Sequence, residues 1–188
     1  MLRFNSDHKF KIMQIADTQE IPAVSPDTLS LINNALDREK PDLVIFTGDQ
    51  IKGYSKKFKK DPAIIESTID ILVEPIAKRN IPFMVTYGNH DAQCGIDNRG
   101  QYKFYAKYDN FISGDLRNSD DVGTADIQIY SSTEDKPVFE LYIIDSHGKA
   151  KDGAGYAPVD KKQIEWYVSR REQLKAENGG YLPSLVFQ

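Results

Sequence analysis

Three short apolar runs, each followed at once by polar residues, constrain the fold of this chain more than any other feature of the sequence. The runs cover residues 9–16, 43–46 and 82–87, and each has the length and character of a buried strand. Helical patterns separate them, and strands that alternate with helices indicate a parallel sheet with right-handed crossovers. We therefore expect the loops after all three strands to lie together at one edge of the sheet.

The segments between these runs begin with helix start signals. Ser25 and Pro26 form an N-cap and first-turn pair before an amphipathic pattern that lasts until Pro41. Asp61 and Pro62 open a second helix in the same way. Each predicted helix thus connects one strand end to the next strand.

The second half of the chain predicts a different arrangement. Two strand-like segments at residues 125–130 and 138–144, joined by a polar turn, indicate a β-hairpin. Asp160 is placed to cap a helix that ends near Gly179. Residues 184–187 then predict another buried strand.

Length and composition are those of an ordinary single-domain protein. The 188 residues, 40% hydrophobic and 28% charged, suffice for one sizeable core. No stretch approaches the roughly 20 apolar residues of a membrane helix, so we expect no membrane anchoring by the chain itself. The N-terminus does not resemble a secretory signal, and the single cysteine, Cys94, fits a reducing compartment. We therefore expect a cytoplasmic location.

The net charge of −4 argues against a general nucleic-acid-binding protein, because such proteins usually carry a basic surface. One basic segment follows Asp49. It would either attract a phosphate-bearing substrate or simply keep a solvated loop soluble. Its lysines are Lys52, Lys56, Lys57, Lys59 and Lys60.

The residues after the three strands form a set suited to bind cations and move protons. Asp17 and Asp49 offer carboxylates, and Asn89 offers an amide oxygen. Divalent cations take these donors, and a bridging carboxylate holds two ions about 3.5 to 4 Å apart, which suits a phosphoryl group. His90 would bind a phosphate oxygen or protonate a leaving group. Each residue alone is typical of a turn or cap, so the prediction depends on their combination.

Three motifs carry a resemblance to a known family: Ala-Asp at residues 16–17, Thr-Gly-Asp-Gln at 47–50 and Gly-Asn-His-Asp at 88–91. In this order they resemble the first half of the calcineurin-like metallophosphoesterase superfamily, in particular its purple-acid-phosphatase-like members. The motifs cover residues 9–91, and the remainder is similar through strand order alone. The resemblance implies a four-layer α/β/β/α sandwich.

The resemblance also implies a reaction, with a role for each residue. A hydroxide activated by two divalent metal ions (Mn, Fe, Zn or Mg) would hydrolyse a phosphate ester, on a small phosphorylated substrate or a phosphoprotein. Asp17 would bind the first metal, Asp49 would bridge both, and Asn89 would bind the second. His90 would be the catalytic residue that stabilises or protonates the departing oxygen.

Two departures from the family concern residues around the metals. The family usually has Asp-x-His where this chain has Asp17-Thr18-Gln19. Gln19 would therefore bind metal through a weaker amide oxygen and shift the metal preference toward harder ions. Many members also place an acid three residues after the bridging aspartate to orient the catalytic histidine, but here that residue is Lys52. Asp91 is a candidate for the same supporting role.

The third departure concerns histidines. The family supplies further metal-binding histidines from later loops, whereas this chain has only His8, His90 and His147. His147 follows a strand end and is a candidate supporting residue, as a metal ligand or as part of a substrate-side loop. We therefore expect residues 1–188 to form a single metallophosphoesterase domain, truncated before the last metal-binding loops and incomplete at its C-terminal side.

Two functions remain open at this point. The first is a phosphoric ester hydrolase, of which this chain alone would bind metal weakly and turn over little. The second is a non-catalytic protein of the same fold that binds a partner or nucleotide through its strand-end loops. An uncovered apolar sheet face also predicts self-association or poor solubility of the chain alone.

Overall fold

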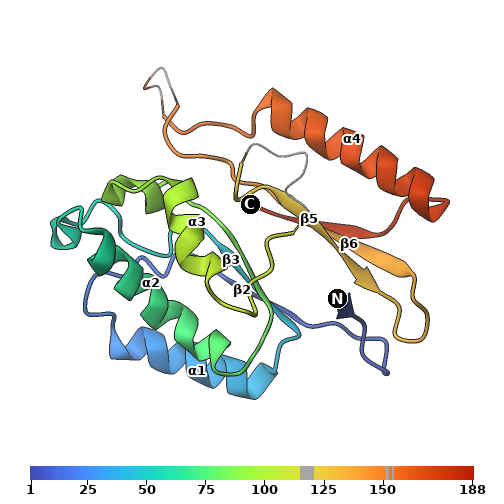
Figure 1. Ribbon diagram of the computed structural model, residues 1–188, viewed down its shortest axis with the longest axis horizontal. Coiled ribbons are helices and arrows are strands. Elements are labelled where there is room, and N and C mark those ends of the chain that lie inside the picture. Colours follow the sequence, from blue (N-terminus) through green and yellow to red (C-terminus); the bar gives the residue numbers. More distant parts are fainter. Residues whose placement is uncertain (115–120, 151–152, 154) are drawn as a thin grey trace.

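The computed structural model describes residues 1–114, 121–150, 153 and 155–188, which form four layers (Figure 1). Two sheets pack face to face, with three helices outside one sheet and one helix outside the other. This arrangement confirms the α/β/β/α sandwich. No helix in the described part of the chain is both long enough and apolar enough to cross a membrane.

The first sheet contains the three predicted parallel strands. They are β2 (Ile12–Ile15), β3 (Leu43–Thr47) and β4 (Phe83–Thr86), in the order β2-β3-β4. Strands β3 and β4 are buried almost throughout, as expected for a covered parallel sheet. The prediction of a buried strand over residues 9–16 was wrong in length and burial. Only four of those residues form β2, and they are at most half-buried because β2 lies at the sheet edge.

Three helices cover the outer face of this sheet, and the first two begin at the predicted caps. α1 (Pro26–Glu39) follows Ser25, whose hydroxyl accepts a hydrogen bond from a backbone N–H of the first turn. α2 (Pro62–Ala77) follows Asp61 in the same way. α3 (Asn98–Ala106) follows the Gly-Asn-His-Asp loop after β4. Because both caps satisfy orphan donors of the first turn, each helix starts at a defined residue.

The second sheet has the order β1-β5-β6-β7. β5 (Ala125–Tyr130) and β6 (Pro137–Ile143) form the predicted antiparallel hairpin. β1 (Leu2–Arg3) pairs in parallel with β5, and β7 (Ser184–Phe187) pairs in parallel with β6. The prediction that residues 184–187 are buried was wrong. Leu185 is 49% exposed, because β7 is an edge strand.

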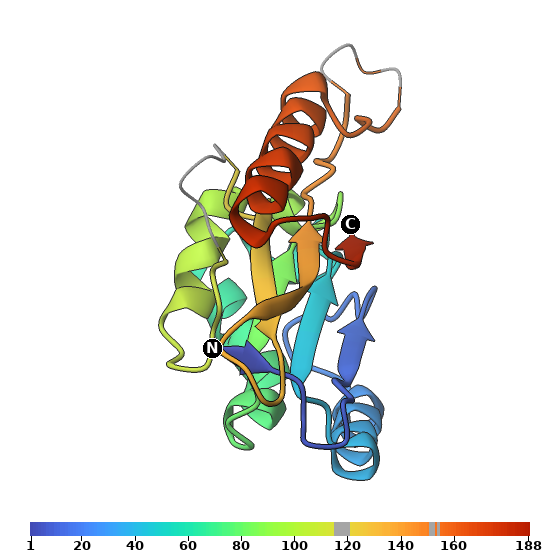
Figure 2. The same cartoon turned by 90° about the vertical axis from the view of Figure 1, so that its right-hand side faces the viewer.

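Apolar residues fill the space between the sheets and under the last helix. Leu43 and Ile45 of β3 meet Leu141 and Ile143 of β6 in the central layer. α4 (Lys161–Asn178) packs on the outer face of the second sheet through Trp166 and Leu174, which form one cluster with Tyr142 and Ile144. Figures 1 and 2, which are related by a quarter turn, both show α4 and α1 on opposite sides of the molecule.

Candidate active site

The loops after β2 and β3 run side by side and are joined by backbone hydrogen bonds. The N–H of Asp17 donates to the carbonyl of Gly48 at 3.1 Å, and the N–H of Gln19 donates to the carbonyl of Asp49 at 2.9 Å. Three sequence-predicted site residues therefore gather at the carboxyl edge of the parallel sheet. This is the edge at which open α/β sheets bind their ligands.

The same three residues have unusual backbone conformations. Asp17, Gln19 and Asp49 adopt left-handed φ angles of 54°, 42° and 52°. Non-glycine residues rarely take such angles, and conformational strain of this kind concentrates at functional sites. Two adjoining loops thus hold their polar side chains in defined, strained positions.

Two glycines let the loops after β3 and β4 touch. A Cβ atom on Gly88 would lie 2.1 Å from Oδ1 of Asp49, and one on Gly48 would lie 2.5 Å from the backbone nitrogen of Gly88. Any side chain at either position would push the loops apart. The glycine before Asp49 and the glycine before Asn89 are therefore what allows these loops to approach.

The carboxylate of Asp49 lies between the other candidate residues. Its Oδ1 accepts a hydrogen bond from the backbone N–H of His90 at 2.8 Å. Its Oδ2 lies 3.5 Å from Nε2 of Gln19 and 3.9 Å from Nε2 of His90. Asp49 is buried, so this arrangement positions a carboxylate at the base of the site.

Asn89 stands beside this centre with unused polar capacity. Its Nδ2 atom is buried and has no hydrogen-bond partner within the described residues. Buried polar groups are nearly always satisfied, so an unsatisfied one at a strand end indicates a missing partner. Because this nitrogen is a hydrogen-bond donor, the group that it could contact is an acceptor that the described residues do not supply.

Asp91 has contacts different from the predicted ones. Its fully buried carboxylate accepts backbone N–H groups of Asp49 and Gly88 at 2.8 Å and of Ile51 at 3.2 Å. Burial raises the pKa of Asp91 to about 7, although the three backbone hydrogen bonds oppose the rise. These contacts fix the loops after β3 and β4 to each other, in place of the expected orientation of His90.

The imidazole of His90 is held by residues that sequence reasoning missed. Its Nδ1 lies 3.1 Å from Oε1 of Gln93, in the 3₁₀ turn η2 (Asp91–Cys94). The Tyr54 ring packs against the imidazole at 4.7 Å between centroids, and Lys52 places its Nζ 5.2 Å from the Tyr54 ring centroid. The spacing of three residues between His90 and Gln93 is the signal that could have revealed this contact.

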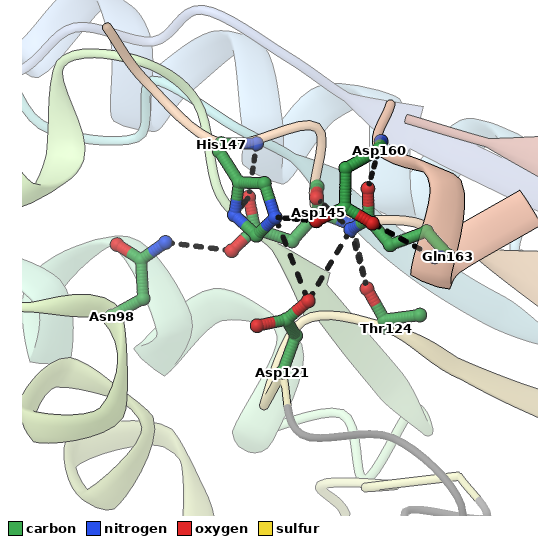
Figure 3. Close-up of polar contacts among 7 residues, drawn as sticks. All are labelled: Asn98, Asp121, Thr124, Asp145, His147, Asp160 and Gln163. Carbon is green, nitrogen blue, oxygen red and sulfur yellow. Dashed lines mark hydrogen bonds and ion pairs between the residues drawn. The ribbon is translucent and has the colours of Figure 1, made fainter. Parts of the chain in front are cut away.

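His147 belongs to a second polar cluster, after β6 (Figure 3). Its Nε2 lies 3.6 Å from Asp121 and 3.9 Å from Asp160, and its Nδ1 lies 4.0 Å from Asp145. Asp145 is buried and accepts a hydrogen bond from Asn98 at 2.7 Å. Burial raises the pKa of Asp145 above its usual range.

This cluster adjoins the strand-end residues. A Cβ atom on Gly148 would lie 3.7 Å from the carbonyl oxygen of Asn89, so the loop after β6 lies close to the Gly-Asn-His-Asp loop after β4. A cavity of about 270 Å³ opens at this junction, with Arg99, Asp121 and His147 among its lining residues. The structure therefore places His147 at the side of the site rather than in contact with Asp49.

Comparison with known proteins decides the family. The sequence profile of the calcineurin-like phosphoesterases matches residues 10–181. The chain belongs to the calcineurin-like phosphoesterase family. Members of the family hydrolyse phosphoesters with divalent metal ions in a dinuclear site, which agrees in kind with the strand-end residues described above.

Individual relatives of this calcineurin-like phosphoesterase are distant. It is 32% identical to phosphatase DCR2 of Saccharomyces cerevisiae, over 88% of this chain and 32% of that protein. It is 28% identical to probable inactive purple acid phosphatase 14 of Arabidopsis thaliana, over 94% of this chain and 50% of that protein. The chain thus spans half or less of the length of these curated relatives.

The fold of this calcineurin-like phosphoesterase is similar to that of solved phosphatases. A dimetal phosphatase from Danio rerio superposes with a TM-score of 0.63 at 13% identity, covering 95% of this chain and 69% of that protein. At this identity the similarity establishes the fold alone. The α/β/β/α arrangement of the layers is therefore that of a dimetal phosphatase.

The residues present fit hard divalent ions in part. Asp17 and Asp49 offer carboxylate oxygens, and Gln19 and Asn89 offer amide oxygens, which suit Mg²⁺ or Mn²⁺ better than softer metals. In the described ranges, no three or more histidine, cysteine or carboxylate side chains are grouped so as to hold an ion. Four donors are also fewer than two ions need, since each takes about six ligands.

Proposed function

We propose that this calcineurin-like phosphoesterase supplies metal ligands and the proton donor of the active site of a phosphate-ester hydrolase. In this proposal Asp17 and Gln19 would hold one ion, Asn89 would hold the other, and Asp49 would be a ligand of both. His90 is the catalytic residue. The observation that supports the proposal most directly is the position of Asp49, whose carboxylate faces Gln19 on one side and His90 on the other.

The chemistry divides between the ions and the chain. When bound, the divalent ions would neutralise the phosphoryl oxygens and provide an activated water as nucleophile. The chain orients His90, because the bond from its backbone N–H to Asp49 fixes the loop and leaves Nε2 on the Asp49 side of the ring. From that side the doubly protonated imidazolium donates its Nε2 proton to the departing oxygen and keeps its proton on Nδ1.

The lysine-rich loop supports a phosphorylated substrate. Lys52 lies over Tyr54, and Tyr54 packs against His90, so the basic segment begins beside the proposed proton donor. The buried Phe58 of η1 (Lys56–Phe58) anchors the loop. Clustered positive charge raises the local concentration of an anionic substrate. A small phosphorylated molecule or a phosphoprotein therefore fits the proposal.

A second candidate is a non-catalytic protein that binds through the same loops. Gln19 replaces the usual metal-binding imidazole with a weaker donor, which favours this alternative. One relative from Arabidopsis thaliana is itself named as probably inactive. A measurement of phosphate-ester hydrolysis therefore distinguishes the enzyme from the non-catalytic binding protein.

The test is hydrolysis of a chromogenic phosphomonoester by the 188-residue chain in the presence of Mn²⁺. We expect slow turnover that a metal chelator abolishes. Asp49→Asn should lower turnover at least about a hundredfold, because it removes the shared carboxylate.

The matched control is Asp109→Asn, because Asp109 is exposed in the turn that follows α3. This variant should have the activity of the unmodified protein. Absence of turnover by the unmodified chain would favour the non-catalytic binding protein. Turnover that survives Asp49→Asn would contradict the assignment of the site.

A further inference from the structure

We propose that Gln93 is the positioning residue that orients the imidazole of His90. The catalytic meaning of this assignment rests on the proposed function. The geometry does not, because it concerns only the contacts of one ring in the folded chain.

The contact between the two residues is made twice. Oε1 of Gln93 lies 3.1 Å from Nδ1 of His90, and the backbone N–H of Gln93 donates to the carbonyl of His90 at 3.1 Å. Both bonds join His90, the N-cap residue of η2, to Gln93 within it, and side chains three residues apart in such a turn stand on the same side. The turn therefore delivers the amide to the imidazole without a long flexible path.

Other residues that could orient His90 are engaged elsewhere. Lys52, at the position where the family usually has an acid, lies against the ring of Tyr54. The Asp91 carboxylate accepts three backbone N–H groups. The Asp49 carboxylate lies on the Nε2 side of the ring. In the described structure, the hydrogen-bond partner of Nδ1 is thus Gln93.

Tyr54 completes the support of the ring. Its aromatic ring meets the imidazole at 62° between planes and 4.7 Å between centroids. An edge-on aromatic contact of this kind restricts rotation of the smaller ring. Gln93 then sets which nitrogen points inward, and Tyr54 keeps the ring from turning away.

The chemical consequence lies in the neutrality of the amide. An acceptor at Nδ1 favours a proton on that nitrogen and leaves Nε2 facing Asp49. A carboxylate at the same place would add a second negative charge near Asp49, and like charges in one site repel. Gln93 therefore fixes the tautomer of His90 while leaving Asp49 as the nearest anionic partner of the ring.

The test is a long-range ¹H–¹⁵N correlation spectrum of the imidazoles of the metal-free 188-residue chain, recorded under alkaline conditions where histidines are neutral. We expect His90 to carry its proton on Nδ1 in the unmodified chain. Gln93→Met, which keeps the length of the side chain but replaces the amide oxygen with a weakly accepting thioether, should shift His90 mainly to the Nε2 tautomer. Gln93→Glu should restore the Nδ1 tautomer.

His8 and His147 serve as internal references, and their signals should not change. Nε2 protonation in the unmodified chain, or the same tautomer with Met at position 93, would overturn the proposal. Loss of structure in the Gln93→Met chain would leave the unmodified and Gln93→Glu spectra to decide. Because no turnover is measured, failure of the proposed enzymatic function would not alter this result.

Discussion

At the scale of single residues, the site depends on a glycine whose lack of a side chain leaves room for a neighbouring carboxylate. Gly88 lets the Asp49 carboxylate lie where a Cβ atom would otherwise be, at 2.1 Å from Oδ1. Asp91 then uses the same closeness to accept N–H groups from both loops. The strand-end residues are thus positioned by close backbone packing before any ligand binds.

Gly88→Ala tests this packing. The added methyl group must displace Asp49, and overpacking of this kind costs about 1 to 3 kcal/mol of folding free energy. Chemical denaturation measures the loss. Gly180→Ala is the matched control, because nothing lies within 4 Å of a Cβ atom at that position. Equal stability of the two variants would show that the loops do not pack as described.

Glu140 is a second residue whose environment makes a measurable prediction. Burial, with the nearby charge of Asp126, raises its pKa to about 9 from an ordinary value of 4.5, while Arg170 opposes the rise. The folded state therefore binds this proton more tightly than the unfolded state does. Its contribution to stability is complete below about pH 4.5 and is lost as the pH rises through about 9.

We expect the stability of the unmodified chain to fall between these pH values more steeply than that of Glu140→Gln, which cannot ionise. Urea unfolding at a series of pH values measures both curves. Because the comparison concerns slopes, a constant difference in stability does not affect it. Parallel curves would mean that Glu140 is ionised in the folded protein.

At the scale of elements, local sequence signals predicted where helices begin, but they did not predict which strands lie at a sheet edge. Capping residues located the start of α1, α2 and α4 because a cap is a contact within one turn. The burial of β2 and β7 was predicted wrongly, since an edge position depends on partners distant in sequence. β1 was missed because a strand of two residues has no period to detect.

The N-cap of α4 offers a test at this scale. The Asp160 carboxylate accepts a hydrogen bond from the backbone N–H of Gln163, and Oε1 of Gln163 accepts one from the backbone N–H of Asp160. Asp160→Ala should cost about 1 kcal/mol of folding free energy, measured by thermal or urea unfolding. Asp160→Asn keeps a capping oxygen and removes the charge beside His147, so it should lose little. A full loss in Asn would assign the effect to that charge instead.

At the scale of the whole molecule, the sequence predicted the layers better than the contacts within the site. The parallel order of β2, β3 and β4 brings the motif residues to one edge, and this followed from strand and helix alternation. The orientation of side chains within loops did not follow. The backbone contacts of Asp91 depend on close packing of the loops after β3 and β4, whereas the contact of Gln93 with His90 depends on the side-chain conformations within one turn.

The central claim is that Asp49 organises a metal site at this sheet edge, and calorimetric titration of Mn²⁺ into the 188-residue chain tests it most directly. We expect weak but saturable binding, at least about tenfold weaker in Asp49→Asn and unchanged in Asp109→Asn. Absence of binding to the unmodified chain, or equal binding by the Asp49→Asn chain, would contradict it.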